Sequence, residues 1–181
     1  FAKKNNIISK SPHKLDNEHD YEFFKSNKPD LVVVVAYGQI ISKRFLDIPG
    51  INFINLHASL LPKWRGAAPI ERSIMSLDKK TGISIMKIVS ELDAGPCMKQ
   101  IAIEIDNEIS ADKLKMQLAK IGSKVLLESI NEIEEGKAKF INQEHKLATY
   151  AKKINKSEAK IEWNYSAKKI IAKINALSPY P

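Results

Sequence analysis

Hydrophobic residues along the 181-residue chain gather in short runs that predict strands, separated by stretches with helical periodicity. The runs at 29–38 (PDLVVVVAYG), 51–56 (INFINL) and 81–89 (TGISIMKIV) are strand-like. The first is continuous and β-branched, which is typical of a buried parallel strand that is covered on both faces. The run at 97–105 (CMKQIAIEI) alternates, so it predicts an edge or antiparallel strand.

Helical periodicity lies between and after these runs. Residues 18–27 and 67–77 predict short helices, and a long helix is expected to begin at the N-cap Ser110 and to stop at Gly136. Its apolar residues repeat near one face: Leu114, Leu118, Ile121, Val125 and Ile130. Beyond Gly136 the chain is polar and Lys-rich, with one amphipathic helix expected at about 166–176. The alternation of strands and helices favours an open α/β sheet over a helical bundle.

Charge is distributed unevenly along the chain, whose formal net charge is +8. Residues 137–181 carry ten Lys and three Glu, a balance of +7, whereas residues 1–136 carry 19 basic and 18 acidic groups, a balance of +1. Such asymmetry favours a phosphate-rich partner, nucleic acid first and an anionic membrane second. The alternative is an ordinary solvated surface in a chain rich in Lys, Ile and Asn.

Composition narrows the class of protein. With 44% hydrophobic and 28% charged residues, the chain is typical of a globular protein that buries a core. The longest apolar run, at 31–37, is far shorter than the roughly 20 residues that a membrane-spanning helix needs. A single cysteine, Cys97, excludes an internal disulfide and a cysteine-rich metal site, and it suits a reducing compartment.

Two polar side chains stand where the second predicted strand gives way to a loop. Asn55 and His57 are two positions apart, so both point to the same side of the strand. Ligands of open α/β sheets bind at the carboxyl ends of strands, and an amide beside an imidazole suits a carbonyl oxygen that gains negative charge. The following loop, SLLPKWRGAAP, is stiffened by Pro62 and Pro69 and could hold a flat ligand.

A third polar residue, Asp93, follows the strand at 81–89 in the turn SELDAGP, which we expect at the same edge of the sheet. Its carboxylate could accept a hydrogen bond from the imidazole and fix the tautomer of the ring. Taken singly, these residues also have structural explanations, because a strand-end His often serves only as a hydrogen-bonding group and Asp before Ala-Gly is a common turn former. In the same way, Trp64 and Cys97 are expected to pack. No two histidines have metal-ligand spacing, and no Gly-rich phosphate loop is present.

The segments NLHASLLP at 55–62 and ELDAGP at 91–96 resemble the formyltransferases that use 10-formyltetrahydrofolate. In that family an Asn-x-His pair and a distant Asp form the catalytic trio, and Ser-Leu-Leu-Pro is a folate-site signature. The stretch WRGAAPIERSI and the tail TYAKKINKSEAKIEWNYSAKKIIAKINALSPYP are similar to the branch of the family that acts on methionyl-tRNA. The resemblance covers nearly the whole chain.

This resemblance implies a domain organisation. A Rossmann-like formyltransferase catalytic domain with an incomplete, mostly parallel sheet is expected over 1–136, a linker over 137–155, and the start of a C-terminal tRNA-binding β-barrel domain over 156–181. The chain would then be an internal segment of the enzyme, without its N-terminal part and most of its C-terminal domain.

The resemblance also implies an activity, the transfer of a formyl group from 10-formyltetrahydrofolate to the α-amine of initiator methionyl-tRNA. The enzyme would be a monomer without a metal, and it would serve translation initiation in the bacterial cytoplasm or the mitochondrial matrix. Its catalytic residues would be Asn55, His57 and Asp93, with the first two stabilising an oxyanion and the third orienting the imidazole. Residues expected in the folate site are Ser59, Leu60, Leu61, Pro62, Tyr37, Gly38, Gln39 and Ile41, and those expected to bind tRNA are Arg65, Lys152 and Lys153. For Tyr37 and Gly38, a plain strand-ending turn is the alternative.

Two other functions stay open at this point. The same trio could formylate a different amine or hydrolyse formyltetrahydrofolate with water. A non-catalytic RNA-binding module would instead place aromatic residues among the C-terminal lysines for base stacking. The aromatic residues there are Tyr150, Trp163, Tyr165 and Tyr180, and they fit a folded helix and turn equally well.

Overall fold

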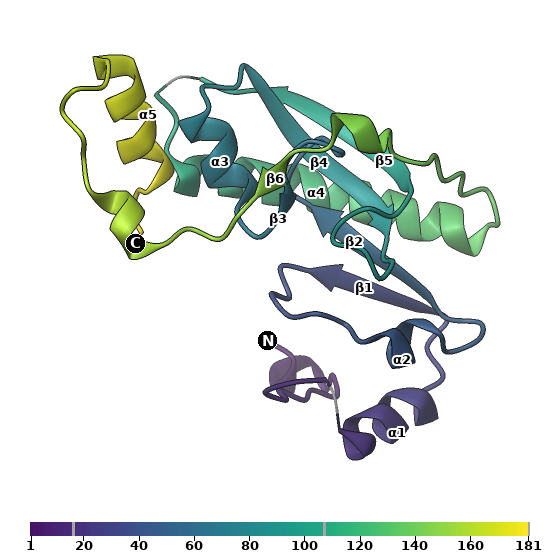
Figure 1. Cartoon of the computed structure of the whole chain (residues 1–181). Helices are drawn as coiled ribbons and strands as arrows, with labels where there is room; N and C mark the ends of the chain where they lie inside the picture. The colour runs from purple at the N-terminus through teal and green to yellow at the C-terminus, as the bar shows by residue number, and fades with distance from the viewer. Residues whose placement is uncertain (16, 107, 181) are drawn as a thin grey trace.

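A four-stranded sheet forms the middle of the protein, in the order β1-β2-β4-β5 (Figure 1). The computed structural model describes residues 1–15, 17–106 and 108–180. The strands of this sheet are β1 Leu31–Val35, β2 Asn52–His57, β4 Lys80–Lys87 and β5 Cys97–Glu104. A second, two-stranded parallel sheet joins β3 Arg65–Gly66 to β6 Tyr150–Ala151. The predicted α/β class and the predicted edge strand at 97–105 are confirmed.

The main sheet is mixed in direction. β1 and β2 are parallel, whereas β2–β4 and β4–β5 are antiparallel, so the described strands form fewer parallel pairs than the sequence predicts. The connection after β2 holds one short helix, α3, Pro69–Met75, and the next strand of the sheet, β4, runs back beside β2.

Five helices surround the sheet in the part of the chain that the structure describes. They are α1 Glu18–Ser26, α2 Lys43–Leu46, α3, α4 Ala111–Glu134 and α5 Ala167–Ala176. Short 3-10 turns add η1 Lys3–Asn5, η2 His145–Leu147 and η3 Lys156–Ala159. As predicted, α4 follows Ser110, whose side-chain oxygen accepts a hydrogen bond from the backbone of Lys113 at 3.4 Å.

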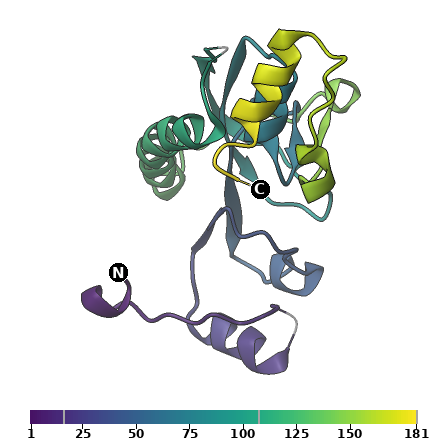
Figure 2. The same ribbon diagram turned by 90° about the vertical axis from the view of Figure 1, so that its left-hand side faces the viewer.

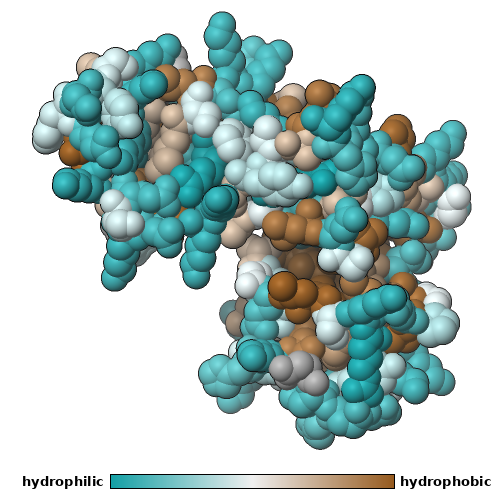
Figure 3. All heavy atoms as spheres, viewed as in Figure 1, coloured by the Kyte–Doolittle hydropathy of each residue, from teal (hydrophilic) through white to brown (hydrophobic). Residues whose placement is uncertain are grey.

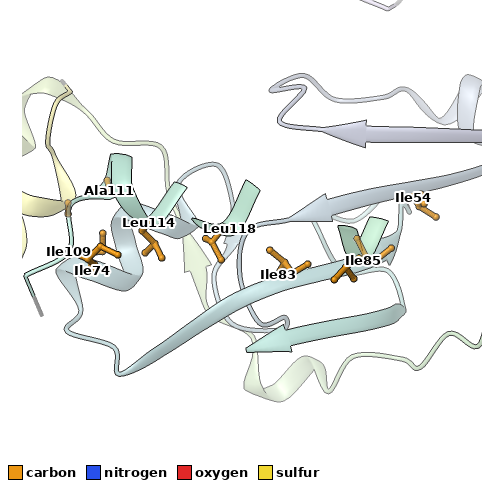
Figure 4. Packing of buried hydrophobic residues seen from close by; sticks show 10 residues of the cluster. Ile54, Ile74, Ile83, Ile85, Ile109, Ala111, Leu114 and Leu118 are labelled. Carbon is orange, nitrogen blue, oxygen red and sulfur yellow. The ribbon is translucent and has the colours of Figure 1, made fainter. Parts of the chain in front are cut away.

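The hydrophobic core lies between β4 and α4 (Figure 4). Ile83 and Ile85 of β4 and Leu114 of α4 are fully buried, and Leu118 packs one turn further along the helix. Helical spacing of the leucines and strand alternation of the isoleucines bring both sets to the same interface. Ile74 of α3 joins this cluster, so the core holds α3 against the sheet and fixes the end of the loop that precedes it.

β1 lies at an edge of the sheet, which corrects the expectation of a strand covered on both faces. Val33 is 38% and Val35 is 52% exposed. Among the described residues β1 pairs only with β2, so its other side and part of its surface meet solvent. Hydrophobic surface gathers around this region in Figure 3. Figure 2 shows β1, α1 and α2 below the rest of the molecule, with α4 to the left of the sheet and α5 to its right.

The segment predicted to be a linker, 137–155, pairs with segments far away in the sequence. We call residues 141–158 the strap. It begins with a bridge between Ile141 and Cys97, continues through β6, and ends at η3 beside α3. Backbone groups in the strap have partners in the loop after β2, so tertiary pairing orders a polar segment that lacks helical or strand periodicity. None of the described helices combines the length and apolarity that crossing a bilayer requires.

Candidate active site

His57 is the last residue of β2 and is 6% exposed. Its Nε2 lies 2.8 Å from the backbone oxygen of Trp64, in the loop that follows the strand. A carbonyl oxygen can only accept a hydrogen bond, so Nε2 carries the hydrogen. The neutral ring therefore presents an unprotonated Nδ1, and the protonated ring presents a second N–H there. This second nitrogen is the one that can act on a ligand.

Asp93 reaches His57 by a route that the sequence did not predict. Because β4 is antiparallel to β2, it ends beside the beginning of β2, where the backbone of Ile88 bonds to Phe53. The Asp93 loop (residues 88–96) then folds back until Asp93 Oδ2 lies 3.6 Å from His57 Nδ1. The two residues thus meet, although the loop does not leave the carboxyl edge of β2 as expected.

The carboxylate of Asp93 is held in one orientation. Its Oδ2 accepts a hydrogen bond of 2.8 Å from the backbone N–H of Gly66. The distance of 3.6 Å to the imidazole is too long for a hydrogen bond. Oδ1 has no hydrogen-bond partner among the described residues, so it is free to accept a proton. The pair can therefore hold and move a proton between an imidazole nitrogen, a carboxylate oxygen and a bound group.

Asn55 lies two residues before His57, on the same face of β2. In the sheet it stands opposite Val34 of β1 and Met86 of β4, so both neighbours fix its backbone. Its half-buried side chain forms no hydrogen bond within the described residues. The backbone of Asn55 is thus fixed from both sides, and its amide is available as a hydrogen-bond donor.

The site loop (residues 58–68) is more buried than the folate prediction requires. Ser59 is fully buried, and its carbonyl accepts a 2.6 Å hydrogen bond from Ser84. Leu61 is 5% exposed, and its backbone N–H donates to the same serine hydroxyl at 3.1 Å. The side chains of these two residues therefore face the inside of the loop, and their predicted place in the folate site stays a prediction. Leu60 and Pro62 stay partly exposed.

The other part of the predicted folate site, residues 36–41, follows β1 and is open to solvent. Gly38 and Gln39 are exposed, Ile41 is partly buried, and Ile40 between them is 89% exposed. The hydroxyl of Tyr37 is buried without a hydrogen-bond partner in the described part of the chain. Buried polar groups are nearly always paired, so this hydroxyl is available to a ligand.

Arg65, which the sequence predicts to contact tRNA phosphates, is buried in this structure. It is 3% exposed, and its Nε and Nη2 donate to Gln143 Oε1 at 3.0 and 2.8 Å. Burial follows from the pairing of β3 with β6, which places the strap over this residue. Lys152 and Lys153, the other two predicted tRNA contacts, are exposed on the strap.

Sequence reasoning missed the residues of the strap that support the site loop. Thr149 Oγ1 accepts a hydrogen bond of 2.9 Å from the backbone of Trp64, and Thr149 O accepts one of 2.9 Å from Arg65. Gln143 contacts both Arg65 and the Asp93 loop. Thr149 and Trp64 are 85 residues apart along the chain. No local sequence pattern indicates that they meet.

The single cysteine and the grouping of possible metal ligands can be described directly. Burial raises the pKa of the Cys97 thiol to about 11, against a smaller opposite effect of Arg65, so the thiol is protonated at neutral pH. Within 1–15, 17–106 and 108–180, no group of three or more His, Cys, Asp or Glu residues has the arrangement of a metal site. A hollow of about 770 Å³ in the N-terminal segment is lined by residues 10–14, 17, 19 and 20. It is lined by none of the trio.

Comparison with known proteins gives a consistent picture. Residues 2–130 match the family described as formyl transferase. The chain is 49% identical over 181 residues to the methionyl-tRNA formyltransferase of Pelagibacter ubique, covering 99% of this chain and 58% of that protein. It is 44% identical over 182 residues to the methionyl-tRNA formyltransferase of Dictyoglomus turgidum, covering 100% of this chain and 58% of that protein. The chain therefore spans 58% of the length of these relatives.

Solved structures share the fold at lower identity. HypX from Aquifex aeolicus, in complex with tetrahydrofolic acid, aligns with a TM-score of 0.77 at 17% identity, over 88% of this chain and 28% of that one. WlaRD, a sugar 3N-formyl transferase in the presence of dTDP and 5-N-formyl-THF, aligns with a TM-score of 0.77 at 22% identity, over 97% of this chain and 60% of that one. The predicted Rossmann-like formyltransferase fold is thus confirmed.

Proposed function

The chain belongs to the formyl transferase family, and on this premise we propose that it carries the catalytic trio of an enzyme that formylates initiator methionyl-tRNA. The formyl donor would be 10-formyltetrahydrofolate. The observation that supports this most directly is the approach of Asp93 to His57, 3.6 Å apart, beside the free amide of Asn55. Asn55 lies two positions before His57 on the same face of β2, so the proposed trio comes from two separate segments of the chain.

The proposed reaction forms one C–N bond and breaks another. The neutral α-amine of the methionyl group attacks the formyl carbon, and the carbonyl oxygen becomes an oxyanion. The amide of Asn55 and the N–H at Nδ1 of protonated His57 stabilise this oxygen. Losing one such donor typically lowers the rate by about 10²–10³. Because Nε2 is already bonded to Trp64, Nδ1 is the only ring nitrogen that can take this role.

Asp93 handles the proton that the amine loses. Its Oδ2 is occupied by Gly66, so Oδ1 accepts the proton as the tetrahedral intermediate forms. The proton then passes to N10 of the folate while the C–N10 bond breaks. The products are formylmethionyl-tRNA and tetrahydrofolate, and atoms and charge balance without an enzyme-bound intermediate.

The donor site is proposed to lie between residues 36–41 and the exposed part of the site loop. The unpaired hydroxyl of Tyr37 supplies a polar group for the folate, and Gly38, Gln39 and Ile41 present backbone beside it. Leu60 and Pro62 provide apolar surface on the opposite side. This assignment keeps most of the residues predicted from sequence and omits the two buried ones.

The acceptor side is proposed to use the strap. Lys152 and Lys153 are exposed, and their backbone carbonyls accept hydrogen bonds from Arg72, which fixes the strap where these side chains leave it. Ordered lysines of this kind suit the phosphates of tRNA. The domain boundaries at 136 and 155, the monomeric state and a bacterial cytoplasmic location stay predictions alongside this proposal.

The trio is tested in a full-length enzyme that contains this segment. We expect His57→Ala and Asp93→Asn each to lower kcat for formyl transfer to methionyl-tRNA by about 10²–10³, because each removes a group that acts in the transition state. The matched controls are His19→Ala in α1 and Asp47→Asn after α2, both exposed. Rates within threefold of the parent in both site variants would remove the catalytic assignment. If the parent enzyme formylates a nucleotide sugar but not methionyl-tRNA, the proposed acceptor is wrong.

A further inference from the structure

The side chain of Gln143 uses every hydrogen-bonding direction of its amide, at 8% exposure. Its Oε1 accepts both hydrogen bonds from Arg65. Its Nε2 donates to the backbone oxygen of Asp93 at 2.9 Å and to that of Gly95 at 2.7 Å. One amide therefore joins the strap, β3 and the Asp93 loop.

These contacts close a ring around the catalytic carboxylate. Asp93 Oδ2 is bonded to Gly66, which follows Arg65 in the chain, and Arg65 is bonded to Gln143, which is bonded back to the carbonyl of Asp93. The carboxylate and the carbonyl of Asp93 are thus held from two directions. Asp93 itself has a φ of +45°, a left-handed conformation that a non-glycine residue keeps only when its surroundings enforce it.

We propose that Gln143 is a positioning residue that fixes the orientation of Asp93 toward His57. The proposal rests on the proposed function for its kinetic consequences, and on the hydrogen bonds alone for its structural ones. Gln143 lies outside the stretch that matches the formyl transferase family, residues 2–130, and within the segment predicted to be a linker. The strap is thereby part of the active site, although no residue of it touches the reacting atoms.

Only an amide satisfies both sides of this position. A Glu side chain keeps the acceptor for Arg65 but turns a carboxylate oxygen toward two backbone carbonyls, which repel it. A Met side chain of similar length loses the hydrogen bonds to Arg65 and those to the Asp93 loop. The two variants therefore separate the contact with Arg65, which supports the fold, from the contact with Asp93, which orients the carboxylate.

The first experiment measures kinetics in the full-length enzyme. Gln143→Glu is expected to lower kcat by about 10²-fold, as a misplacement of about 1 Å does, with KM for both substrates within twofold of the parent. Placed on Asp93→Asn, Gln143→Glu is expected to lower kcat by less than threefold further, because it acts through a carboxylate that is already gone. Fully multiplicative losses, or an unchanged kcat in the single variant, would overturn the proposal.

The second experiment does not depend on activity. The amide of Gly66 donates to Asp93, so its hydrogen exchange reports whether the carboxylate stays in place. Exchange at Gly66 is expected to speed up at least about tenfold in Gln143→Glu and Gln143→Met, and to stay unchanged in Gln117→Glu on the exposed face of α4. Unaltered exchange in both site variants would also overturn the proposal. If the parent enzyme does not transfer a formyl group, the proposed function is wrong, but the exchange measurement still tests whether Gln143 holds Asp93.

Discussion

The two sides of the candidate active site differ in how they are held. The site loop is bonded to the strap along its length, from Pro62 and Trp64 to Ala68, and the indole N–H of Trp64 donates to Asp78 at 2.7 Å. Residues 36–41 form no hydrogen bond to the rest of the described chain outside the β1 pairing, and Ile40 is 89% exposed. One side is fixed before any ligand binds, and the other is open.

This difference separates two tasks. The fixed side carries Asn55, His57 and Asp93, to which we assign the chemical step, and the rate of such a step would depend on their relative positions. The open side carries residues that we assign to the folate, a ligand that must enter and leave. Local stability is low where few apolar contacts and few backbone hydrogen bonds are made, which is the case at 36–41. The comparison therefore predicts that perturbations of equal size cost more on the strap side.

The largest expected effect comes from a pair of glycines, one on each side. Gly66 has a φ of +116°, and a Cβ there would lie 2.8 Å from the backbone oxygen of Ala151 in the strap. Gly38 has a φ of +71°, with nothing within 4 Å of an added Cβ. We expect Gly66→Ala to lower the free energy of unfolding by about 3 kcal/mol, and Gly38→Ala by about 1 kcal/mol from backbone strain alone. Denaturant unfolding of the full-length protein measures both, and equal losses would contradict the comparison.

A smaller effect is expected on tRNA binding. Replacing Lys152 and Lys153 with Ala should reduce the slope of log affinity against log salt by about 2, since each phosphate contact contributes about 0.9. The matched control replaces Lys3 and Lys4, two adjacent exposed lysines in the N-terminal segment. Filter binding of methionyl-tRNA between 50 and 200 mM salt gives both slopes. If both pairs lower the slope equally, the strap has no special part in binding tRNA.

The smallest effect concerns the end of the strap. Glu158 accepts hydrogen bonds from Arg72 at 2.6 and 3.1 Å and one from the backbone of Asn155, and these lower the pKa of its carboxyl to about 2. A carboxyl whose pKa is lowered by folding stabilises the folded state above its ordinary pKa of about 4.5, and this contribution fades as the pH falls from there toward 2.

Glu158→Gln should therefore be less stable than the parent at pH 7, and this difference should shrink as the pH falls below about 4.5. Thermal melts across that range measure it, with Glu162→Gln at an exposed position as the control. A difference that stays constant as the pH falls from about 4.5 to about 2.5 would mean that charge on Glu158 does not hold the strap.

Local sequence patterns determined most of the elements of this protein. Helical spacing and a Ser cap placed α4, because side chains three and four residues apart share a face whatever lies beyond them. Strand alternation placed Asn55 and His57 on one side of β2, since that relation depends only on the strand itself. The motif around them was sufficient to indicate the family.

Only the tertiary structure decided which groups these residues meet. Nothing near Arg65 in the sequence indicates that Gln143 covers it, and nothing near Asp93 indicates that its loop folds back from an antiparallel strand. Likewise, the polar strap has no periodicity of its own and is ordered by partners about 80 residues away. Backbone periodicity is a local property, whereas burial and hydrogen-bond pairing depend on segments that the chain brings together only when it folds.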